Sequence, residues 1–143
     1  IGDWSQPKVQ LLGVRGAPGN TINHTTSYWV PRHSPRVFVE RVDMVCGIGY
    51  DRARELGQQA ARFHEIRCVV SNLGVFDFAN EHGRMQVRSR HPGVELSEIC
   101  EQTGFELIVP EHVPQTRLPT KSELDLLRAV IDRDGLSARE VSP

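Results

Sequence analysis

The stretch IRCVVSNLGVFDFA, residues 66–79, decides the fold class. Residues 66–72 contain a continuous run of apolar side chains, which is typical of a strand covered on both faces, as in a parallel α/β sheet. Residues 73–79 continue this strand into a bend. We therefore expect a sheet strand at 66–72 with other layers of the protein packed on both of its faces.

Further strands are expected on either side of this stretch. Apolar runs or strict alternation predict them at residues 9–14, 36–42, 84–90 and 105–109. The polar and aromatic segment 23–35 has neither pattern and is expected to be a loop or a short turn of helix.

Helices are expected between and after these strands. Residues 51–62 have helical propensity that Gly57 interrupts. A second helix follows the Pro92–Gly93 turn and ends at Gly104; its apolar face is made of Leu96, Ile99 and Cys100.

The last predicted helix begins with a capping box. Thr120 and Glu123 have the required spacing, and the stripe that follows consists of Leu124, Leu127 and Ile131. Strands therefore alternate with helices or loops in the second half of the chain, a pattern that favours the α/β class.

Composition describes an ordinary globular protein. The 143 residues suffice for one domain, 1–143, and 17 Lys and Arg balance 18 Asp and Glu. This net charge of −1 gives no electrostatic reason to expect nucleic acid or an anionic membrane as partner. No apolar run approaches the length of a spanning helix. The cysteines are expected to be buried free thiols of a cytoplasmic protein: Cys46, Cys68 and Cys100.

A glycine-rich segment, GVRGAPGN at residues 13–20, is the first candidate site. Bare backbone after a strand turns sharply and directs main-chain amides at an anion or a developing oxyanion. The spacing matches neither a P-loop nor the dinucleotide-binding GxGxxG pattern. From the residues alone, a plain structural turn and a ligand site both remain open.

Polar residues beside this segment are candidates for chemistry. Asn20, Asn23 and His24 offer hydrogen bonds to a carbonyl group or acid–base catalysis. Glu40 interrupts an apolar strand and faces either a ligand crevice or solvent. The histidines and cysteines have no metal-ligand spacing, so no metal site is expected. Ser71 has no base near it in the sequence, which disfavours a serine hydrolase.

Two motifs resemble a known family. VVSNLGVFDF, residues 69–78, and HPGVELSEICEQTGFEL, residues 91–107, are similar to the C-terminal part of β subunits of class I CoA-transferases of the glutaconate and 3-oxoacid type. The resemblance extends over about residues 9–140. GVRGAPGNTINHTTSYW, residues 13–29, is most similar to a hydrolytic branch that opens steroid rings carried as CoA thioesters. The resemblance implies a CoA-transferase-like fold, which is a layered sheet with flanking helices. It also implies that this chain is the C-terminal portion of a longer subunit.

The resemblance also implies roles for the glycine-rich segment. In the family, this loop lies against the thioester and its amides hold the carbonyl oxygen. Pro18 removes one N–H, so the remaining donors are the amides of Ala17, Gly19 or Asn20. This departure from the family's Gly-x-Gly-Gly pattern agrees better with the hydrolytic branch. The family's Glu-Asn-Gly nucleophile motif does not occur in this sequence, so we expect the chain to be the C-terminal half of such a subunit or a shortened homologue.

The expected site therefore combines a backbone cradle with polar side chains. Acyl-CoA binding is expected at Gly16, Gly19, Asn20 and Asn23, and catalysis at His24 and Glu40. CoA would be part of the substrate, no cofactor would be bound permanently, and the partner would be an α-type CoA-transferase subunit. Two alternatives remain: CoA transfer between dicarboxylic or 3-oxo acids, and a non-catalytic remnant that binds a partner or CoA.

Overall fold

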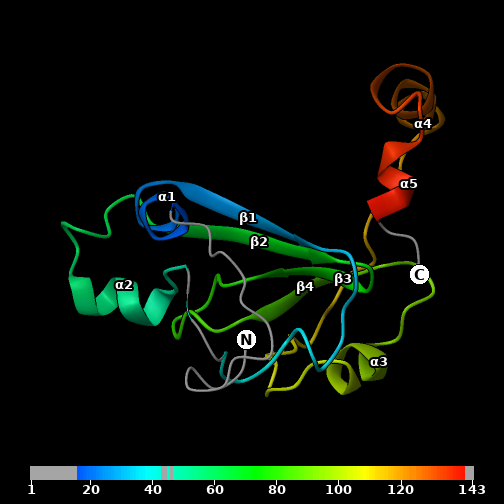
Figure 1. The fold of residues 1–143 in the computed structure, drawn as a ribbon. Helices are drawn as coiled ribbons and strands as arrows, with labels where there is room; N and C mark the ends of the chain where they lie inside the picture. Colours follow the sequence, from blue (N-terminus) through cyan, green and yellow to red (C-terminus); the bar gives the residue numbers. More distant parts are fainter. Residues whose placement is uncertain (1–15, 43–44, 46, 141–143) are drawn as a thin grey trace, which may run out of the picture.

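The computed structural model describes residues 16–42, 45 and 47–140. The strand predicted at 9–14, together with Gly13 and Cys46, lies outside these residues. A four-stranded sheet forms the body of the protein, with short helices around it and a helical segment that projects from one end (Figure 1). The predicted α/β class is confirmed.

The sheet is mixed rather than purely parallel. Its strands follow the order β1-β2-β3-β4, with bounds Thr25–Val30, Glu65–Ser71, Gly74–Asp77 and Gln86–Arg90. β1 pairs with β2 in parallel, whereas the β2–β3 and β3–β4 pairs are antiparallel. The strand expected at 66–72 is therefore present as β2 and occupies an inner position in the sheet. The expected cover on both of its faces is not found among the described residues, since Glu65 and Arg67 of this strand are exposed.

The helices are short. They are α1 (Ala17–Asn23), α2 (Tyr50–Leu56), α3 (Leu96–Glu101), α4 (Lys121–Leu126), the π-helix η1 (Leu127–Ile131) and α5 (Leu136–Glu140). α2 ends at Gly57, whose φ of 84° is accessible at low cost to glycine. The predicted capping box is confirmed, since Thr120 Oγ1 accepts from the Glu123 amide and the Glu123 carboxylate accepts from the Thr120 amide.

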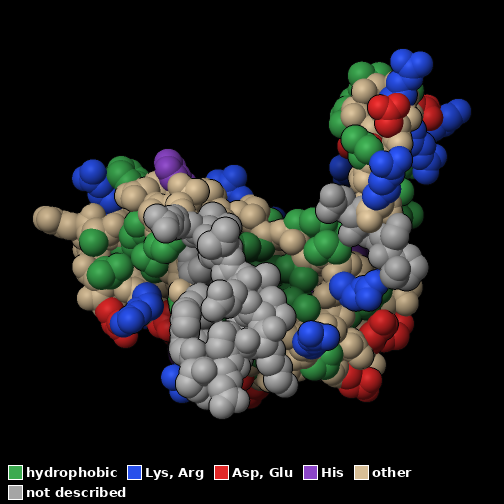
Figure 2. All heavy atoms as spheres, in the orientation of Figure 1, with side chains coloured by type: hydrophobic (Ala, Val, Ile, Leu, Met, Phe, Trp, Pro, Cys, Tyr) green, Lys and Arg blue, Asp and Glu red, His purple; other side chains and the backbone are tan. Residues whose placement is uncertain are grey.

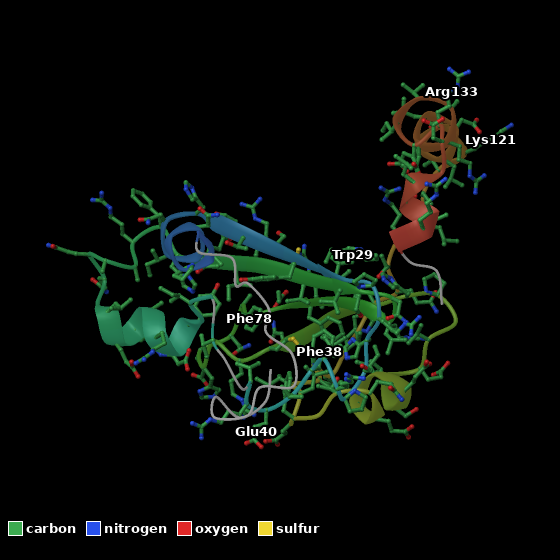
Figure 3. All side chains as sticks on the ribbon, viewed as in Figure 1. Trp29, Phe38, Glu40, Phe78, Lys121 and Arg133 are labelled. Carbon is green, nitrogen blue, oxygen red and sulfur yellow. The ribbon has the colours of Figure 1, made fainter. Side chains whose placement is uncertain are left out.

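One hydrophobic core lies between the sheet and the segments beneath it. Its fully buried members are Phe76, Val87 and Ile99, from β3, β4 and α3. Phe38 joins this core from the loop after β1, and Figure 3 shows it pointing toward the underside of the sheet. The core thus holds α3 and the 33–42 loop against one face.

Two sequence predictions at the first half of the chain are wrong. Residues 36–42 do not form a strand: the amides of Val37 and Phe38 both donate to the Ser34 carbonyl oxygen, at 2.9 Å, in a turn. The segment expected to be a loop instead contains β1. Tertiary contacts override local β-propensity here, because the turn is what buries the Phe38 ring.

The strand expected at 105–109 is reduced to a single bridge between Ile108 and Gln86. The predicted helix end at Gly104 also changes, since α3 stops at Glu101. Gly104 is needed for another reason. Its amide donates to the Phe38 carbonyl oxygen at 2.7 Å, and a Cβ at Gly104 would lie 2.6 Å from that oxygen.

The cysteine prediction holds in part. Cys68 and Cys100 are free thiols, as expected, but Cys68 is only partly buried and Cys100 is exposed. α3 turns Ile99 to the core and leaves the next residue facing solvent. Among the residues with described structure, no helix has both the length and the apolarity needed to cross a membrane.

A buried histidine ties the end of β1 to β2 and α3. His33 is 5% exposed and stacks on the Phe38 ring, with 3.9 Å between the ring centroids. Its Nδ1 lies 2.9 Å from Ser71 Oγ, and its Nε2 lies 3.0 Å from Thr103 Oγ1. Because these partners come from distant segments of the chain, the network fixes their relative positions.

The donor and acceptor of each of these hydrogen bonds follow from the other hydrogen bonds that Thr103 and Ser71 make. Thr103 Oγ1 donates to the Ile99 carbonyl oxygen at 2.7 Å, so it accepts from His33 Nε2–H. Ser71 Oγ accepts from the Leu73 amide at 3.2 Å and donates to His33 Nδ1. The network therefore requires a neutral imidazole, and burial lowers the pKa of His33 to about 4.

Sequence reasoning missed the base beside Ser71, because His33 lies far from it along the chain. The Ser71–His33 pair nevertheless cannot act as a nucleophile and base. Ser71 is 0% exposed, so its hydroxyl is out of reach of a substrate. The pair is a structural element, and a serine hydrolase remains disfavoured.

The His33 network makes stability depend on pH. Since its folded-state pKa lies below the ordinary value of 6.5, the unfolded chain binds more protons between about pH 4 and 6.5. The stabilisation is fully present above pH 6.5 and is lost as the pH falls toward 4, by at most about 3 kcal/mol.

Urea unfolding at several pH values tests this pH dependence of the free energy of unfolding. His33→Gln should lose this pH slope and the exposed His112→Gln should keep it; the reverse would contradict the assignment.

Candidate functional site

α1 gathers every predicted site residue except Glu40. Gly16 is the N-cap of this helix, Gly19, Asn20 and Asn23 lie within it, and His24 is its C-cap. The described part of the glycine-rich segment, residues 16–20, is therefore a helix start, where a loop was expected. Pro18 explains the difference, because proline fits the first turn of a helix, where its missing N–H is not needed.

One main-chain amide at this helix start donates to a carbonyl oxygen of the chain, and two others have no acceptor among the described residues. The Asn20 amide donates to the Gly16 carbonyl oxygen at 2.9 Å and is no longer available to a ligand. The amides of Ala17 and Gly19 have no acceptor within the described part of the chain. A Cβ built on Gly19 meets nothing within 4 Å, so the space beside this turn is open.

Thr21 anchors α1 to the rest of the body. Its side chain is buried, and Oγ1 donates to the Ala17 carbonyl oxygen at 2.8 Å while accepting from the Ile48 amide at 2.9 Å. The Thr21 carbonyl oxygen in turn accepts from His64 Nδ1 at 2.6 Å. One residue thus joins the helix, the 47–49 loop and the segment before β2.

A cavity of about 380 Å³ opens at the C-terminal end of α1. It lies where the helix end and the start of β1 meet the start of β2. Its lining residues are Asn23, His24, Thr25, Arg62, Phe63, His64 and Glu65. Two predicted residues, Asn23 and His24, therefore share a cavity, although the Asn23 amide group already donates to the Gly19 carbonyl oxygen at 2.9 Å.

His64 is the cavity residue that sequence reasoning missed. Because a carbonyl oxygen only accepts, the bond to Thr21 places the proton on Nδ1 and leaves Nε2 as an acceptor. Nε2 is buried and has no hydrogen-bond partner among the described residues. Such an atom favours a ligand or water that donates to it. The parallel β1–β2 pairing brings it beside α1, and no local sequence signal could have revealed this.

Glu40 is not brought to this site. The Glu40 side chain is exposed in the loop after β1. Figure 3 shows Glu40 below the sheet, whereas α1 lies at the upper side of the sheet, beside β1, in the same view. The turn at 34–38 stands where the strand that contains Glu40 was expected. The described residues also contain no group of three or more His, Cys, Asp or Glu side chains arranged to hold a metal ion.

Comparison with known proteins agrees with the sequence motifs. The chain is 51% identical over 141 residues to a Mycobacterium tuberculosis H37Rv protein named the cholesterol ring-cleaving hydrolase IpdB subunit, covering 99% of this chain and 56% of that protein. It is 29% identical over 134 residues to the B-type subunit of the 3-oxoadipate CoA-transferase of Pseudomonas knackmussii, covering 91% and 50%. The chain is thus similar to a ring-cleaving hydrolase subunit and, more distantly, to a B-type subunit of a CoA-transferase. No protein-family model matches the chain.

Solved structures confirm the CoA-transferase-like fold. A crystal structure of Rhodococcus jostii RHA1 IpdAB matches with a TM-score of 0.89 and 48% identity, covering 100% of this chain and 57% of the other. Glutaconate CoA-transferase from Acidaminococcus fermentans matches in fold, with a TM-score of 0.81 and 24% identity over 100% and 54% of the two chains. The chain thus spans about half the length of the curated relatives it matches.

The anchoring role of Thr21 is testable. We expect Thr21→Val to lower the free energy of unfolding by about 1–3 kcal/mol, because the half-buried Ile48 amide loses its acceptor, the buried Thr21 hydroxyl, while the side-chain shape is kept. Thr25→Val is the matched control, since the Thr25 hydroxyl bonds the Glu65 carboxylate at an exposed position. Urea unfolding measures both variants. Equal effects would show that the Thr21 hydroxyl does not anchor α1.

Proposed function

We propose that this chain is part of a β-type subunit that acts on a CoA thioester, with hydrolytic opening of a steroid-derived ring as the reaction. The observation that carries this proposal is the 51% identity, over 99% of the chain, to a relative named as a ring-cleaving hydrolase subunit. The similarity includes the segment that forms α1. The chain itself would be a single CoA-transferase-like domain of the longer subunit.

The open amides of α1 support a role in carbonyl chemistry. Hydrolytic ring opening and CoA transfer both place negative charge on a carbonyl oxygen in the transition state. Two main-chain donors at Ala17 and Gly19 would stabilise that charge, and one such donor is typically worth about 3–4 kcal/mol of the barrier. The Asn20 amide is excluded from this role by its bond to Gly16, so we restrict the proposed donors to these two.

Side chains around the cavity support a role in general acid–base catalysis. We propose that His24, exposed at the end of α1, exchanges protons with the substrate or with the attacking water. Asn23 would contact the acyl-CoA from the same end of the helix. Glu40 lies away from this group and would act only if a partner or substrate spans the distance. CoA would be bound as part of the substrate.

A partner completes the proposed enzyme. The structural match is named IpdAB, a name that joins two polypeptides, and the CoA-transferase relative is likewise one of two types of polypeptide. We therefore propose an α-type subunit as partner, contributing further catalytic groups. The first turn of α1 and the cavity beside it would form this chain's share of the active site.

Substitution at Gly19 tests the cradle. We expect Gly19→Val to lower kcat/KM for a steroid-ring CoA thioester at least tenfold in the assembled enzyme, because the added side chain projects beside the open amides. The free energy of unfolding should change by less than about 1 kcal/mol, since the space around Gly19 is empty and valine has the higher helix propensity. Unchanged kinetics in a folded variant would make this segment a plain helix start.

Product analysis separates hydrolysis from CoA transfer. Hydrolytic ring opening adds one water: its hydroxyl ends in the new carboxylate, its hydrogen on the carbon released by the broken C–C bond, and the CoA thioester survives. We expect a product heavier by one water, with one labelled oxygen when the reaction runs in ¹⁸O-water. Borohydride trapping of a glutamyl-CoA thioester on either subunit would instead indicate the transferase alternative. Saturable CoA binding without turnover would indicate a remnant.

A further inference from the structure

α1 is held to the body through a single buried residue. Thr21 is 4% exposed, and it is the one buried residue among the seven residues of this helix. A helix of this length is marginal in water without tertiary contacts. Figure 1 shows α1 at the end of the sheet where β1 and β2 begin. The hydrogen bonds that Thr21 makes with the body therefore decide where α1 lies.

The Thr21 hydroxyl also reaches the peptide group that carries the Gly19 amide. Thr21 Oγ1 donates to the Ala17 carbonyl oxygen at 2.8 Å, and the Pro18 carbonyl oxygen, at 3.2 Å, is a second acceptor for it. The Pro18 carbonyl group and the Gly19 N–H belong to one peptide unit, which is planar. A bond that fixes the direction of this carbonyl group therefore fixes the direction of the Gly19 N–H as well.

His64 holds the main chain of Thr21. Its Nδ1–H donates to the Thr21 carbonyl oxygen at 2.6 Å, and the two residues are 43 positions apart in the chain. Thr21 is the third residue from the end of α1, where carbonyl oxygens lack a donor within the helix. A histidine side chain is suited to bind such a terminal carbonyl group. His64 therefore closes the last turn of α1 from outside the helix.

The imidazole of His64 is itself held in place. The Tyr50 ring packs edge-on against it, with 5.0 Å between the ring centroids. The Tyr50 hydroxyl accepts from the Ile66 amide at 3.0 Å and donates to the Ile66 carbonyl oxygen at 3.3 Å. Tyr50 also packs at 5.5 Å on the ring of Phe78, which contacts the hydrophobic core (Figure 3). The start of β2 and the core thus set the position of the Nδ1–H donor.

The Nδ1–H donor is what distinguishes this imidazole from an apolar ring. Nε2 of His64 is buried and has no hydrogen-bond partner among the described residues, and an unpaired buried acceptor is costly. A phenyl ring would fill the same space without that cost. The bond to Thr21 is therefore the contribution of a histidine at this position.

We infer that His64 is a positioning residue for the reaction and that, through Thr21, it keeps the Gly19 N–H aimed at the substrate carbonyl oxygen. This inference rests on the proposed function, in which the amides of Ala17 and Gly19 stabilise charge on that oxygen. A donor displaced by about 1 Å loses much of its effect, because transition-state stabilisation depends on preorganised geometry. Loss of the His64 bond should therefore lower kcat and leave KM nearly unchanged.

The test uses two substitutions of nearly equal shape. Asparagine has an N–H donor in the place of Nδ1, whereas leucine has a methyl group there, so the two variants differ in the bond to Thr21. Both are made in the full subunit and assayed in the assembled enzyme on a steroid-ring CoA thioester. We expect His64→Leu to lower kcat at least tenfold, with KM changed less than about twofold. His64→Asn should restore kcat to within about threefold of wild type.

A double substitution separates positioning from a loss of stability. Gly19→Val already blocks the open amides, so adding His64→Leu to it should lower kcat/KM further by less than about twofold. A substitution that only destabilises the fold would lose the same factor with or without Gly19→Val. If His64→Leu does not fold, His64→Phe takes its place with the same expected loss, because it keeps the ring and lacks the donor.

The outcomes separate this inference from the proposed function. Wild-type kcat in His64→Leu would overturn the role of His64 and leave the proposed function in place. Equal losses in His64→Leu and His64→Asn would do the same, and so would losses that multiply in the double variant. A wild-type enzyme that does not turn over the CoA thioester would overturn both.

Discussion

The parallel pairing of β1 with β2 is the constraint on which the candidate site depends. Its register runs from Thr25 opposite Glu65 to Val30 opposite Ser71. At the first end, the pairing sets the end of α1 against the segment before β2 and so creates the cavity. At the other end, it carries His33 to the hydroxyl of Ser71. A shift in register would disturb both ends at once.

α1 is held in place by bonds on one side and offers main-chain N–H donors at its first turn. Thr21 fastens the helix through its hydroxyl and its carbonyl group, so the bonds that fix α1 lie on its buried side. Helix geometry gives the first-turn amides of Ala17 and Gly19 no acceptor within the helix, and none lies elsewhere among the described residues. A rigid scaffold with unpaired donors costs no reorganisation when charge develops on a bound carbonyl group.

The body and the C-terminal segment that contains α4, η1 and α5 are stabilised in different ways. The body buries Phe76, Val87 and Ile99 in its own core and satisfies the polar atoms of the His33 network internally. The C-terminal segment instead satisfies its helix ends through local bonds, such as the capping box, and leaves large apolar side chains exposed. Figure 2 shows hydrophobic and basic side chains together on this segment. Local bonds fix the shape of the C-terminal segment, whereas burial fixes the shape of the body.

The sequence by itself determined those features that depend on local patterns. The strand at 66–72 and the capping box at Thr120 were predicted because propensity and capping act within a few residues. So were the motifs that led to the family. The helix predicted over 51–62 was found only as far as Leu56. Tertiary structure alone decided the turn at 34–38, the strand β1, and the meeting of His64 with Thr21. These depend on pairing and burial between residues that are distant in the chain, which no short-range pattern encodes.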